Sequence, residues 1–207
     1  MIDWDALETQ ALEQQNCIAF ADLSSRFVPG EGDNPTAMII GEAPGATEAI
    51  TRRPFVGPAG QVLRELMDIA GLKADSRSYA AVSDPPNCWL TNVVKFRPPK
   101  NRKPEWAEVQ AARPWLREEW LAIGSPKLII PVGGTALTVV TGRQSISILR
   151  AAGKCHAYKS RLGPEMYIWP MVHPSFGLRN PEVQPLLEQD WEALGVWRNE
   201  FESTGGA

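Results

Sequence analysis

The sequence predicts an α/β fold, a three-layer sandwich in which helices flank a mostly parallel central sheet of about four strands. Short apolar runs of strand type alternate along the chain with longer amphipathic segments of helical period. Such alternation is typical of a parallel sheet with helices on its faces. Several of these runs end directly in small or polar residues, where α/β proteins place their sites. We expect a single domain over residues 1–207, because this length suffices for one hydrophobic core.

The amino-terminal third predicts two helices, a loop and a strand. Residues 2–16 place apolar side chains among Glu and Gln, as an amphipathic helix does, whereas residues 24–36 are rich in Ser, Pro, Gly, Asp and Asn and predict a loop. The apolar run 37–40 predicts the first strand. A helix over 61–71 with Gly71 as its C-cap is predicted by five apolar residues at helical spacing: Val62, Leu63, Leu66, Met67 and Ala70.

The rest of the chain continues the alternation. Residues 73–88 are polar and predict a surface loop, and residues 90–95 predict the second strand with its exit. The run 97–104 can be neither helix nor central strand, because its prolines lack the N–H donor. The remaining predicted elements are, in order, a Trp-rich helix at 105–123, a strand at 127–132, a short helix opened by Gly133 and Gly134, loops at 142–164 with room for one edge strand, a strand at 168–172 and a helix at 185–201.

The composition is that of a globular protein. Hydrophobic residues make up 43% and charged residues 22%, and no apolar run approaches the roughly 18 residues that a membrane span needs. The start of the chain lacks a basic region followed by an apolar one, which argues against a signal peptide. We therefore expect a soluble, cytoplasmic monomer. A net charge of −3 does not itself indicate a nucleic-acid binder, although a local basic face can still bind phosphates.

The cysteines support no covalent or metal framework. Cys17, Cys88 and Cys155 are widely spaced and odd in number, no Cys-x-x-Cys pair exists, and the chain has only two histidines. Neither a disulfide framework nor a zinc site is indicated by these counts. We expect no bound metal and no cofactor.

Three strand ends deliver a carboxylate, an amide and an imidazole. Glu42 follows the first predicted strand, Asn92 follows the second and His173 follows the last. Because the carboxyl ends of parallel strands meet at one edge of the sheet, we expect these side chains in one crevice. A side-chain amide offers donors and an acceptor together, as reading one edge of a pyrimidine requires. A neutral imidazole N–H can stabilise an anion that forms on a carbonyl oxygen.

Each candidate also has a structural interpretation, which the residues leave open. Glu42 could be a solvated acid in a tight loop, and Asn92 could be a turn former. Glu48 could be a helix-start acid that the helix dipole favours. Phe55 lies beside Pro and Gly, where an aromatic ring either packs in the core or forms a stacking platform for a flat ligand.

Basic residues are concentrated after the second strand. Such a run is either a solvated face or the electrostatic footprint of a polyanion. Beyond His173, Ser175 and Arg179 could hold phosphate oxygens, and Ser175 could equally be the N-cap of a short helix. The five cations within nine residues are Lys95, Arg97, Lys100, Arg102 and Lys103.

Four motifs resemble, in this order, those of the uracil-DNA glycosylase superfamily, and most closely its family four, the thermostable iron–sulfur type. The resemblance extends from about Ala37 to about Arg179. The motifs are GEAPG at 41–45, RPFVGPAG at 53–60, TNVVKFRPPKNRKP at 91–104 and HPS at 173–175.

This resemblance implies a monofunctional enzyme that flips uracil out of DNA and hydrolyses its N-glycosidic bond, leaving an abasic site. Its partner would be uracil-containing DNA, single- or double-stranded. Phe55 would stack on the base, Asn92 would read its Watson–Crick edge and His173 would stabilise the departing anion. Either Glu42 or Glu48 would orient the attacking water. The implied uracil-binding residues are Gly41, Ala43, Phe55 and Asn92, and the implied DNA-binding residues are Lys95, Arg97, Asn101, Arg102, Ser175 and Arg179.

The sequence departs from family four at the cluster cysteines. Family members hold a four-iron cluster on four cysteines, and here only Cys17 matches one of them. Phe20, Phe96 and Ala112 stand near the other three positions. One cysteine cannot hold a cluster that needs thiolate ligands. We therefore expect no cluster, and apolar packing by Phe20, Phe96 and the Trp residues in its place.

Two other functions stay open at this point. The missing cysteines would suit a catalytically inactive glycosylase-fold protein that binds DNA. The small Ala43 and Gly45 would leave room for another deaminated base, hypoxanthine or xanthine. The intact residues at the expected catalytic positions favour an active uracil glycosylase.

Overall fold

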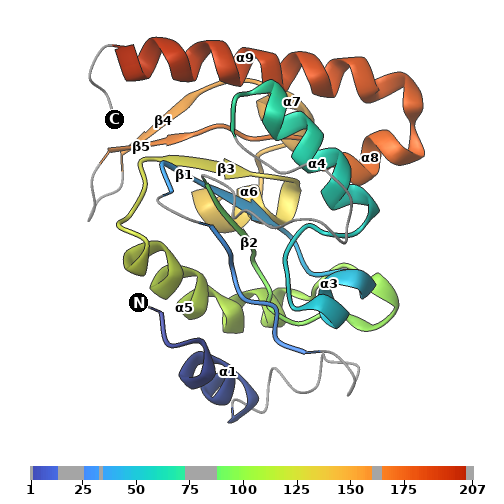
Figure 1. The fold of residues 1–207 in the computed structure, drawn as a ribbon, viewed down its shortest axis with the longest axis vertical. Helices are drawn as coiled ribbons and strands as arrows, with labels where there is room; N and C mark the ends of the chain where they lie inside the picture. Colours follow the sequence, from blue (N-terminus) through green and yellow to red (C-terminus); the bar gives the residue numbers. More distant parts are fainter. Residues whose placement is uncertain (1, 14–25, 33–34, 73–87, 160–164, 204–207) are drawn as a thin grey trace.

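The computed structural model describes residues 2–13, 26–32, 35–72, 88–159 and 165–203. Within these ranges the strands form a five-stranded sheet in the order β2-β1-β3-β5-β4 (Figure 1). β1 pairs in parallel with β2 and β3, β3 pairs in parallel with β5, and β4 is an antiparallel edge strand. The strands are β1 (Ala37–Gly41), β2 (Trp89–Asn92), β3 (Leu128–Pro131), β4 (His156–Lys159) and β5 (Glu165–Ile168).

Eight α-helices and two short 3-10 turns surround the sheet in the described part of the chain. The helices are α1 (Trp4–Glu13), α3 (Ala46–Thr51), α4 (Pro58–Ile69), α5 (Trp106–Ala122), α6 (Gly134–Thr141), α7 (Ile148–Ala151), α8 (Pro174–Arg179) and α9 (Gln184–Ser203). The 3-10 turns are η1 (Pro99–Asn101) and η2 (Pro181–Val183).

β1 lies between β2 and β3, and its apolar sequence fits that position. All five of its residues are buried, as expected for a parallel strand that is covered on both faces. Side chains alternate across the sheet, so Ala37 and Ile39 belong to one core cluster while Met38 and Ile40 belong to the other.

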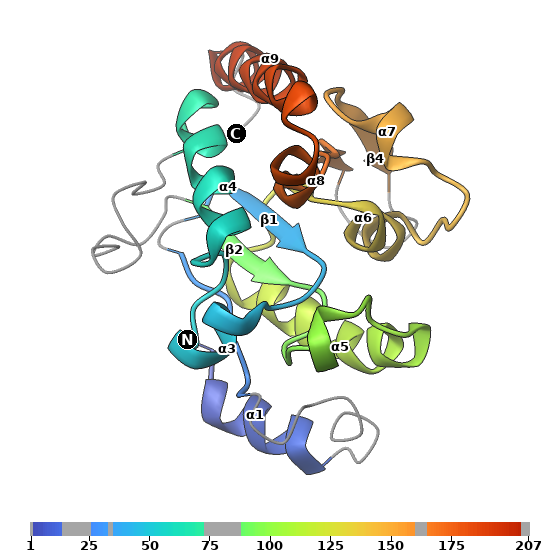
Figure 2. The same cartoon turned by 90° about the vertical axis from the view of Figure 1, so that its right-hand side faces the viewer.

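Helices cover both faces of the sheet, which gives three layers (Figures 1 and 2). α4 and α9 pack on the Ile39 face, and α5 and α6 pack on the Met38 face. The first core includes Leu63, Leu66, Met67, Leu187, Trp191 and Leu194; the second includes Phe27, Val109, Ala112, Trp115, Ala136 and Val139.

The predicted fold class is confirmed, with one strand more than the expected four or so. The fifth strand, β4, lies in the segment that left room for an edge strand. The last predicted strand is placed wrongly, since β5 ends at Ile168. Residues 169–172 continue beside β3, where Trp169 N–H donates to Ile129 O at 2.9 Å and Met171 N–H donates to Pro131 O at 2.9 Å. The ladder is interrupted because Pro131 of β3 has no N–H to donate in return.

The longer helices lie close to their predicted ranges, and the short ones were not all expected. α4 begins three residues earlier than predicted, with Pro58 in its first turn, and is capped by Ala70, with Gly71 following at φ 67°. α3, α7 and α8 have only four to six residues, too few for a period to be visible in the sequence. The surface loop predicted at 73–88 lies outside the described residues except for Cys88, which is buried.

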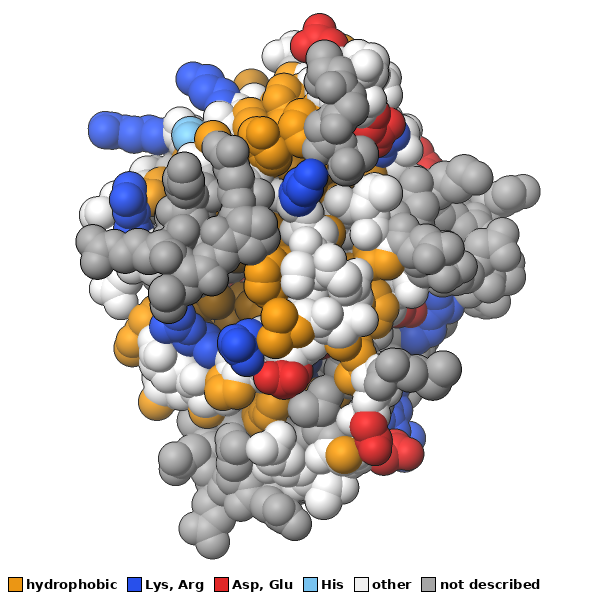
Figure 3. All heavy atoms as spheres, turned by 90° about the vertical axis from the view of Figure 1, so that its left-hand side faces the viewer, with side chains coloured by type: hydrophobic (Ala, Val, Ile, Leu, Met, Phe, Trp, Pro, Cys, Tyr) orange, Lys and Arg blue, Asp and Glu red, His pale blue; other side chains and the backbone are white. Residues whose placement is uncertain are grey.

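The surface mixes charges of both signs. Figure 3 shows one face on which Lys and Arg lie among hydrophobic and acidic side chains, consistent with the small net charge of −3. None of the helices in the described ranges has the length and apolar composition that crossing a membrane requires.

Candidate active site

A cavity of about 580 Å³ lies at the carboxyl ends of the parallel strands. Figure 2 shows the arrowheads of β1 and β2 side by side, between α3 and α6. The loops that leave β1, β2, β3 and β5 all contribute to the cavity wall, as the strand-end argument predicts. Ten of the thirteen predicted site residues line it: Glu42, Ala43, Glu48, Phe55, Asn92, Asn101, Arg102, His173, Ser175 and Arg179.

Gly41 lies beneath this cavity and lets two pocket residues meet. It pairs with Asn92 in the β1–β2 register. A Cβ at this position would lie 2.4 Å from Asn92 Oδ1 and 2.5 Å from Phe55 Cζ, closer than real Cβ contacts come. A glycine is therefore required where the amide and the aromatic ring converge.

Phe55 is held in a constrained backbone conformation. Its φ is 54°, in the left-handed region that bulky residues rarely adopt. The carbonyl oxygen of Phe55 accepts a hydrogen bond from Arg64 Nε at 3.0 Å, and a Cβ on Gly60 would lie 2.1 Å from the Phe55 carbonyl carbon. The loop is thus packed closely onto α4, and Phe55 lines the cavity with 6% of the residue exposed.

Asn92 ends β2 and is 4% exposed. Its side-chain oxygen points toward Gly41 and the Phe55 ring, and its backbone oxygen accepts a hydrogen bond from Lys95 Nζ at 3.0 Å. The amide therefore stands in the cavity wall on a backbone that is fixed from behind.

The two candidate carboxylates have different surroundings. Glu42 is half-buried, and one of its oxygens accepts a hydrogen bond from Thr135 Oγ1 of α6. Glu48 is 8% exposed and accepts three backbone N–H bonds, from Gly45 at 3.1 Å, Val56 at 3.1 Å and Gly57 at 2.7 Å. The bond from Gly45 N–H places this carboxylate at the start of α3, as its helix-start interpretation expects.

His173 caps α8 through its ring. Nδ1 accepts the backbone N–H of Ser175 at 3.1 Å, so a neutral ring carries its proton on Nε2. Burial, reinforced by the positive charge of Arg179, lowers the pKa of His173 from 6.5 to about 4. The imidazole is consequently neutral near pH 7, as the sequence argument requires. The N-cap interpretation of Ser175 is wrong, because His173 occupies that position.

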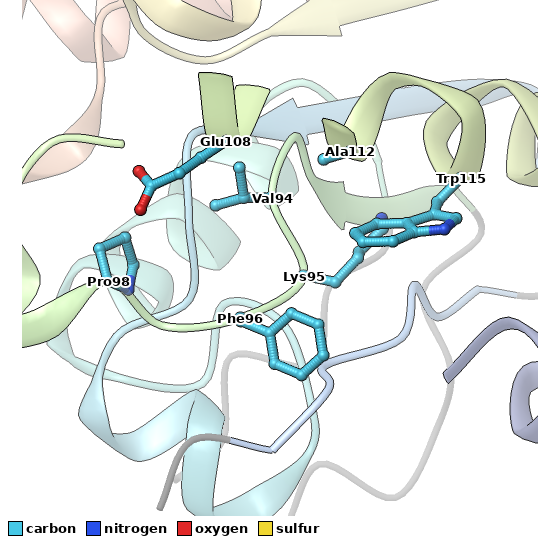
Figure 4. Close-up of a pocket in the computed structure, with 7 residues that line it drawn as sticks. All are labelled: Val94, Lys95, Phe96, Pro98, Glu108, Ala112 and Trp115. Carbon is cyan, nitrogen blue, oxygen red and sulfur yellow. The ribbon is translucent and has the colours of Figure 1, made fainter. Parts of the chain in front are cut away.

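The structure contradicts the DNA-binding prediction for Lys95. Its side chain has no solvent exposure and pairs with Glu119 at 2.7 Å. Sequence reasoning placed it with its basic neighbours, because a local charge run carries no information about a partner 24 residues away. Figure 4 shows that Lys95 and Trp115 line the same internal pocket.

The other predicted phosphate-binding residues lie nearer the surface. Arg97 Nε donates to Asn101 Oδ1 at 2.7 Å, outside the core. Arg102 pairs with the buried Glu108 of α5 through two guanidinium nitrogens and also lines the cavity. Arg179 is exposed at the end of α8. Asn101, Arg102, Ser175 and Arg179 line the cavity, whereas Arg97 does not.

Several supporting residues had no signal in the sequence. The role of Thr135 is recognised only in the structure, where α6 places its hydroxyl group against Glu42. Arg64, Glu31 and Glu119 hold the backbone behind Phe55 and Asn92. Only Arg64 had a possible sign in the sequence, because this cation lies between the apolar positions Leu63 and Leu66 of an amphipathic helix.

The described residues at the expected cluster positions do not fit an iron–sulfur cluster. Phe96 is buried and packs edge-on against Phe27 at 5.6 Å and Trp115 at 6.5 Å between ring centroids. Ala112 lies in the same core cluster. The pocket beside them holds only about 20 Å³ (Figure 4), roughly room for one water. The predicted packing by Phe96 and a Trp is confirmed, whereas Cys17 and Phe20 lie outside the described residues.

Comparison with known proteins agrees with this geometry. The family model described as "Uracil DNA glycosylase superfamily" matches residues 29–196. The chain is 36% identical to the "Type-4 uracil-DNA glycosylase" of Sulfurisphaera tokodaii over 81% of its length and 72% of the relative. It is 37% identical to the protein of that name from Pyrobaculum aerophilum, with 79% of each chain covered, and 36% identical to that from Thermotoga maritima, with 81% of each covered.

The matched region contains all four motifs and every strand of the sheet. Its first matched residues include Gly30 and Glu31, which contact Glu119 and Arg64. Motif order, fold and similarity over most of the sequence lead to one assignment: the chain belongs to the uracil-DNA glycosylase superfamily.

Proposed function

We propose that this protein hydrolyses the N-glycosidic bond of uracil flipped out of DNA, leaving an abasic site as in base excision repair. One observation carries the proposal: Phe55, Asn92, His173 and Glu42 line the same cavity. The relatives' name, "Type-4 uracil-DNA glycosylase", supports the same activity. The proposed catalytic unit is a single domain and acts as a monomer in the cytoplasm.

The pocket has the groups that recognition of uracil needs. The ring of Phe55 offers a stacking face for the flipped base. The amide of Asn92 pairs with the uracil edge, accepting from N3–H and donating to O4. Ala43 adds a small wall, and Gly41 keeps the ring and the amide at their close separation.

Bond cleavage needs little acid catalysis. The C1′–N1 bond breaks with its electron pair leaving on uracil, whose negative charge spreads onto O2. His173 donates a hydrogen bond from its Nε2–H to that oxygen. The ring does this as a neutral imidazole, without carrying a positive charge. The positive charge that develops on the sugar is offset by the carboxylate of Glu42 and by DNA phosphates.

Water completes the reaction at C1′. Its oxygen forms the new bond to C1′, its proton passes to Glu42 or to solvent, and the uracil anion takes up a proton after release. Glu42 is the better candidate to orient this water, because Thr135 engages one of its oxygens while the residue faces the cavity. The carboxylate of Glu48 is already occupied by three backbone N–H donors.

DNA is held by the groups around the cavity rim. Arg97, Asn101, Arg102, Ser175 and Arg179 are the proposed phosphate contacts. Flipping costs a few kcal/mol and costs least at a mismatch, so uracil opposite guanine should be processed faster than uracil opposite adenine.

Release of uracil from oligonucleotides tests the proposal. Single-stranded DNA and duplexes with U:G or U:A pairs are incubated with the protein, and abasic sites are revealed by alkali cleavage. Asn92→Ala is the control in which release of uracil is strongly reduced but still measurable. DNA binding without cleavage of any substrate would contradict the proposal and indicate an inactive DNA-binding protein. Cleavage confined to hypoxanthine or xanthine substrates would replace uracil by another deaminated base.

A further inference from the structure

We propose that Lys95 and Glu119 are positioning residues that fix Asn92 in the base pocket, an inference that rests on the proposed function of Asn92. Both side chains are fully buried behind β2, outside the cavity, and neither touches the site where a base would lie. They act through the backbone that carries the amide.

Lys95 makes one hydrogen bond for each of its three N–H donors. The acceptors are Asn92 O at 3.0 Å, Glu119 Oε2 at 2.7 Å and Thr91 Oγ1. An ammonium group is the form that has three donors. The negative charge of Glu119 opposes the burial that lowers the pKa of Lys95. The lysine therefore connects the end of β2 to helix α5 through hydrogen bonds.

Glu119 completes the network without leaving an oxygen unused. Oε2 accepts from Lys95 and from Thr91 Oγ1, the latter at 2.8 Å, while Oε1 accepts from Gly30 N–H at 3.1 Å. A Cβ at Gly30 would lie 3.0 Å from that carboxylate oxygen and 2.4 Å from the Trp89 ring, so only glycine permits this approach.

The network continues to the other wall of the pocket. Glu31, which follows Gly30, exchanges backbone hydrogen bonds with Leu90 of β2 at 2.7 and 2.9 Å. Its carboxylate pairs with Arg64 Nη2 at 2.8 Å, and Arg64 Nε donates to the carbonyl oxygen of Phe55. A series of buried and partly buried polar contacts, joined through the Gly30–Glu31 backbone, thus reaches the backbone of both Asn92 and Phe55.

Stability alone is a weak reason for such a network. A buried ion pair gains little over well-packed apolar residues, because both charges are desolvated. Preorganisation of the pocket is a stronger reason for the network, since a small displacement of a binding group can lower the rate on the order of a hundredfold. A carbonyl held from the interior fixes the strand end without occupying the space that the base needs.

A double-mutant cycle in uracil release tests the inference. Lys95→Met removes the charge at similar volume, and we expect a loss in kcat/KM on the order of a hundredfold. In an Asn92→Ala background the same change should have almost no further effect, because the residue through which it acts is gone. Arg198→Met is the matched control, since Arg198 is a largely buried cation paired with Glu202 at 3.2 Å on α9. It should leave kcat/KM unchanged in both backgrounds.

Equal losses in both backgrounds, or no loss in the first, would overturn the positioning role. If Lys95→Met does not fold, Thr91→Val removes the hydroxyl shared by Lys95 and Glu119 and carries the same comparison. A wild-type chain that releases no uracil would overturn the proposed function instead. The inference is then decided by the side-chain amide NMR signals of Asn92: they should shift in Lys95→Met and stay in place in Arg198→Met, and unchanged signals in both variants would overturn it.

Discussion

The backbone N–H of Ser175 donates to Nδ1 of His173 at 3.1 Å, and this contact sets the chemical state of the ring. The helix cap consumes the lone pair on one nitrogen, which leaves Nε2 as the donor. The local fold thus supplies a hydrogen-bond donor at neutral pH from a side chain that has no net charge.

His173 should titrate near pH 4 instead of pH 6.5. As the pH falls through this window, the unfolded chain takes up a proton that the folded chain does not, so the free energy of unfolding decreases. NMR titration of the imidazole, assigned by its loss in His173→Gln, measures the pKa. Arg179→Met should raise it toward the ordinary value, because a nearby cation is removed. A wild-type midpoint near 6.5 would contradict the burial argument.

Exchange of the two carboxylates for amides should separate their roles. Glu42→Gln is expected to lower kcat by about a hundredfold or more with little change in thermal stability. Glu48→Gln is expected to lose about 1–3 kcal/mol of stability, because an amide nitrogen would face a backbone N–H donor. Single-turnover kinetics and urea unfolding measure the two effects. The opposite pattern would make Glu48 the residue that orients the water.

Gly41→Ala should damage the pocket. The added methyl group would meet Asn92 Oδ1 and the Phe55 ring, and the resulting overpacking costs about 1–3 kcal/mol of stability. Uracil release should fall at the same time, since both displaced groups belong to the base site. Gly134→Ala is the stability control, because a Cβ there would meet nothing within 4 Å. Equal unfolding midpoints for the two variants would show that the Gly41 contacts can relax.

The salt dependence of DNA binding should distinguish rim cations from the buried one. Arg97→Met and Arg179→Met should each reduce the slope of log K against log salt by about one, because each removes a phosphate contact. Lys95→Met should leave the slope unchanged, since Lys95 has no solvent exposure. Fluorescence anisotropy over a salt series measures the slopes. A reduced slope in Lys95→Met would restore its place among the phosphate-binding residues.

Phe96→Ala should destabilise the protein by about 3–5 kcal/mol, as loss of a buried aromatic ring does. The ring packs against Phe27 and Trp115 beside a small pocket, so its removal would leave a larger cavity in the core. Urea unfolding followed by Trp fluorescence measures the loss. Phe201→Ala, at the partly buried end of α9, should cost less and serves as the comparison.

The fold class could be predicted from the sequence because the spacing of apolar residues within each helix or strand is a local property. β1 reads as an apolar run and is buried throughout, and the strand-end residues Glu42, Asn92 and His173 do line one cavity. The limit of the last strand was missed, since the missing donor lies in Pro131 of the neighbouring strand and not in the apolar run itself. The buried pairing of Lys95 depends on α5, which comes later in the chain. The three backbone partners of Glu48 exist only once the loop at 55–57 has folded against α3.

The packing of Phe27, Phe96 and Trp115 also bears on what the cell must supply. The three rings pack against one another through protein atoms alone, so folding of the chain is enough to complete this part of the core without iron or sulfide. Aromatic rings are also indifferent to chelators and to the peroxide that destroys exposed thiolate-bound iron. This part of the described core can therefore fold in the presence of a metal chelator.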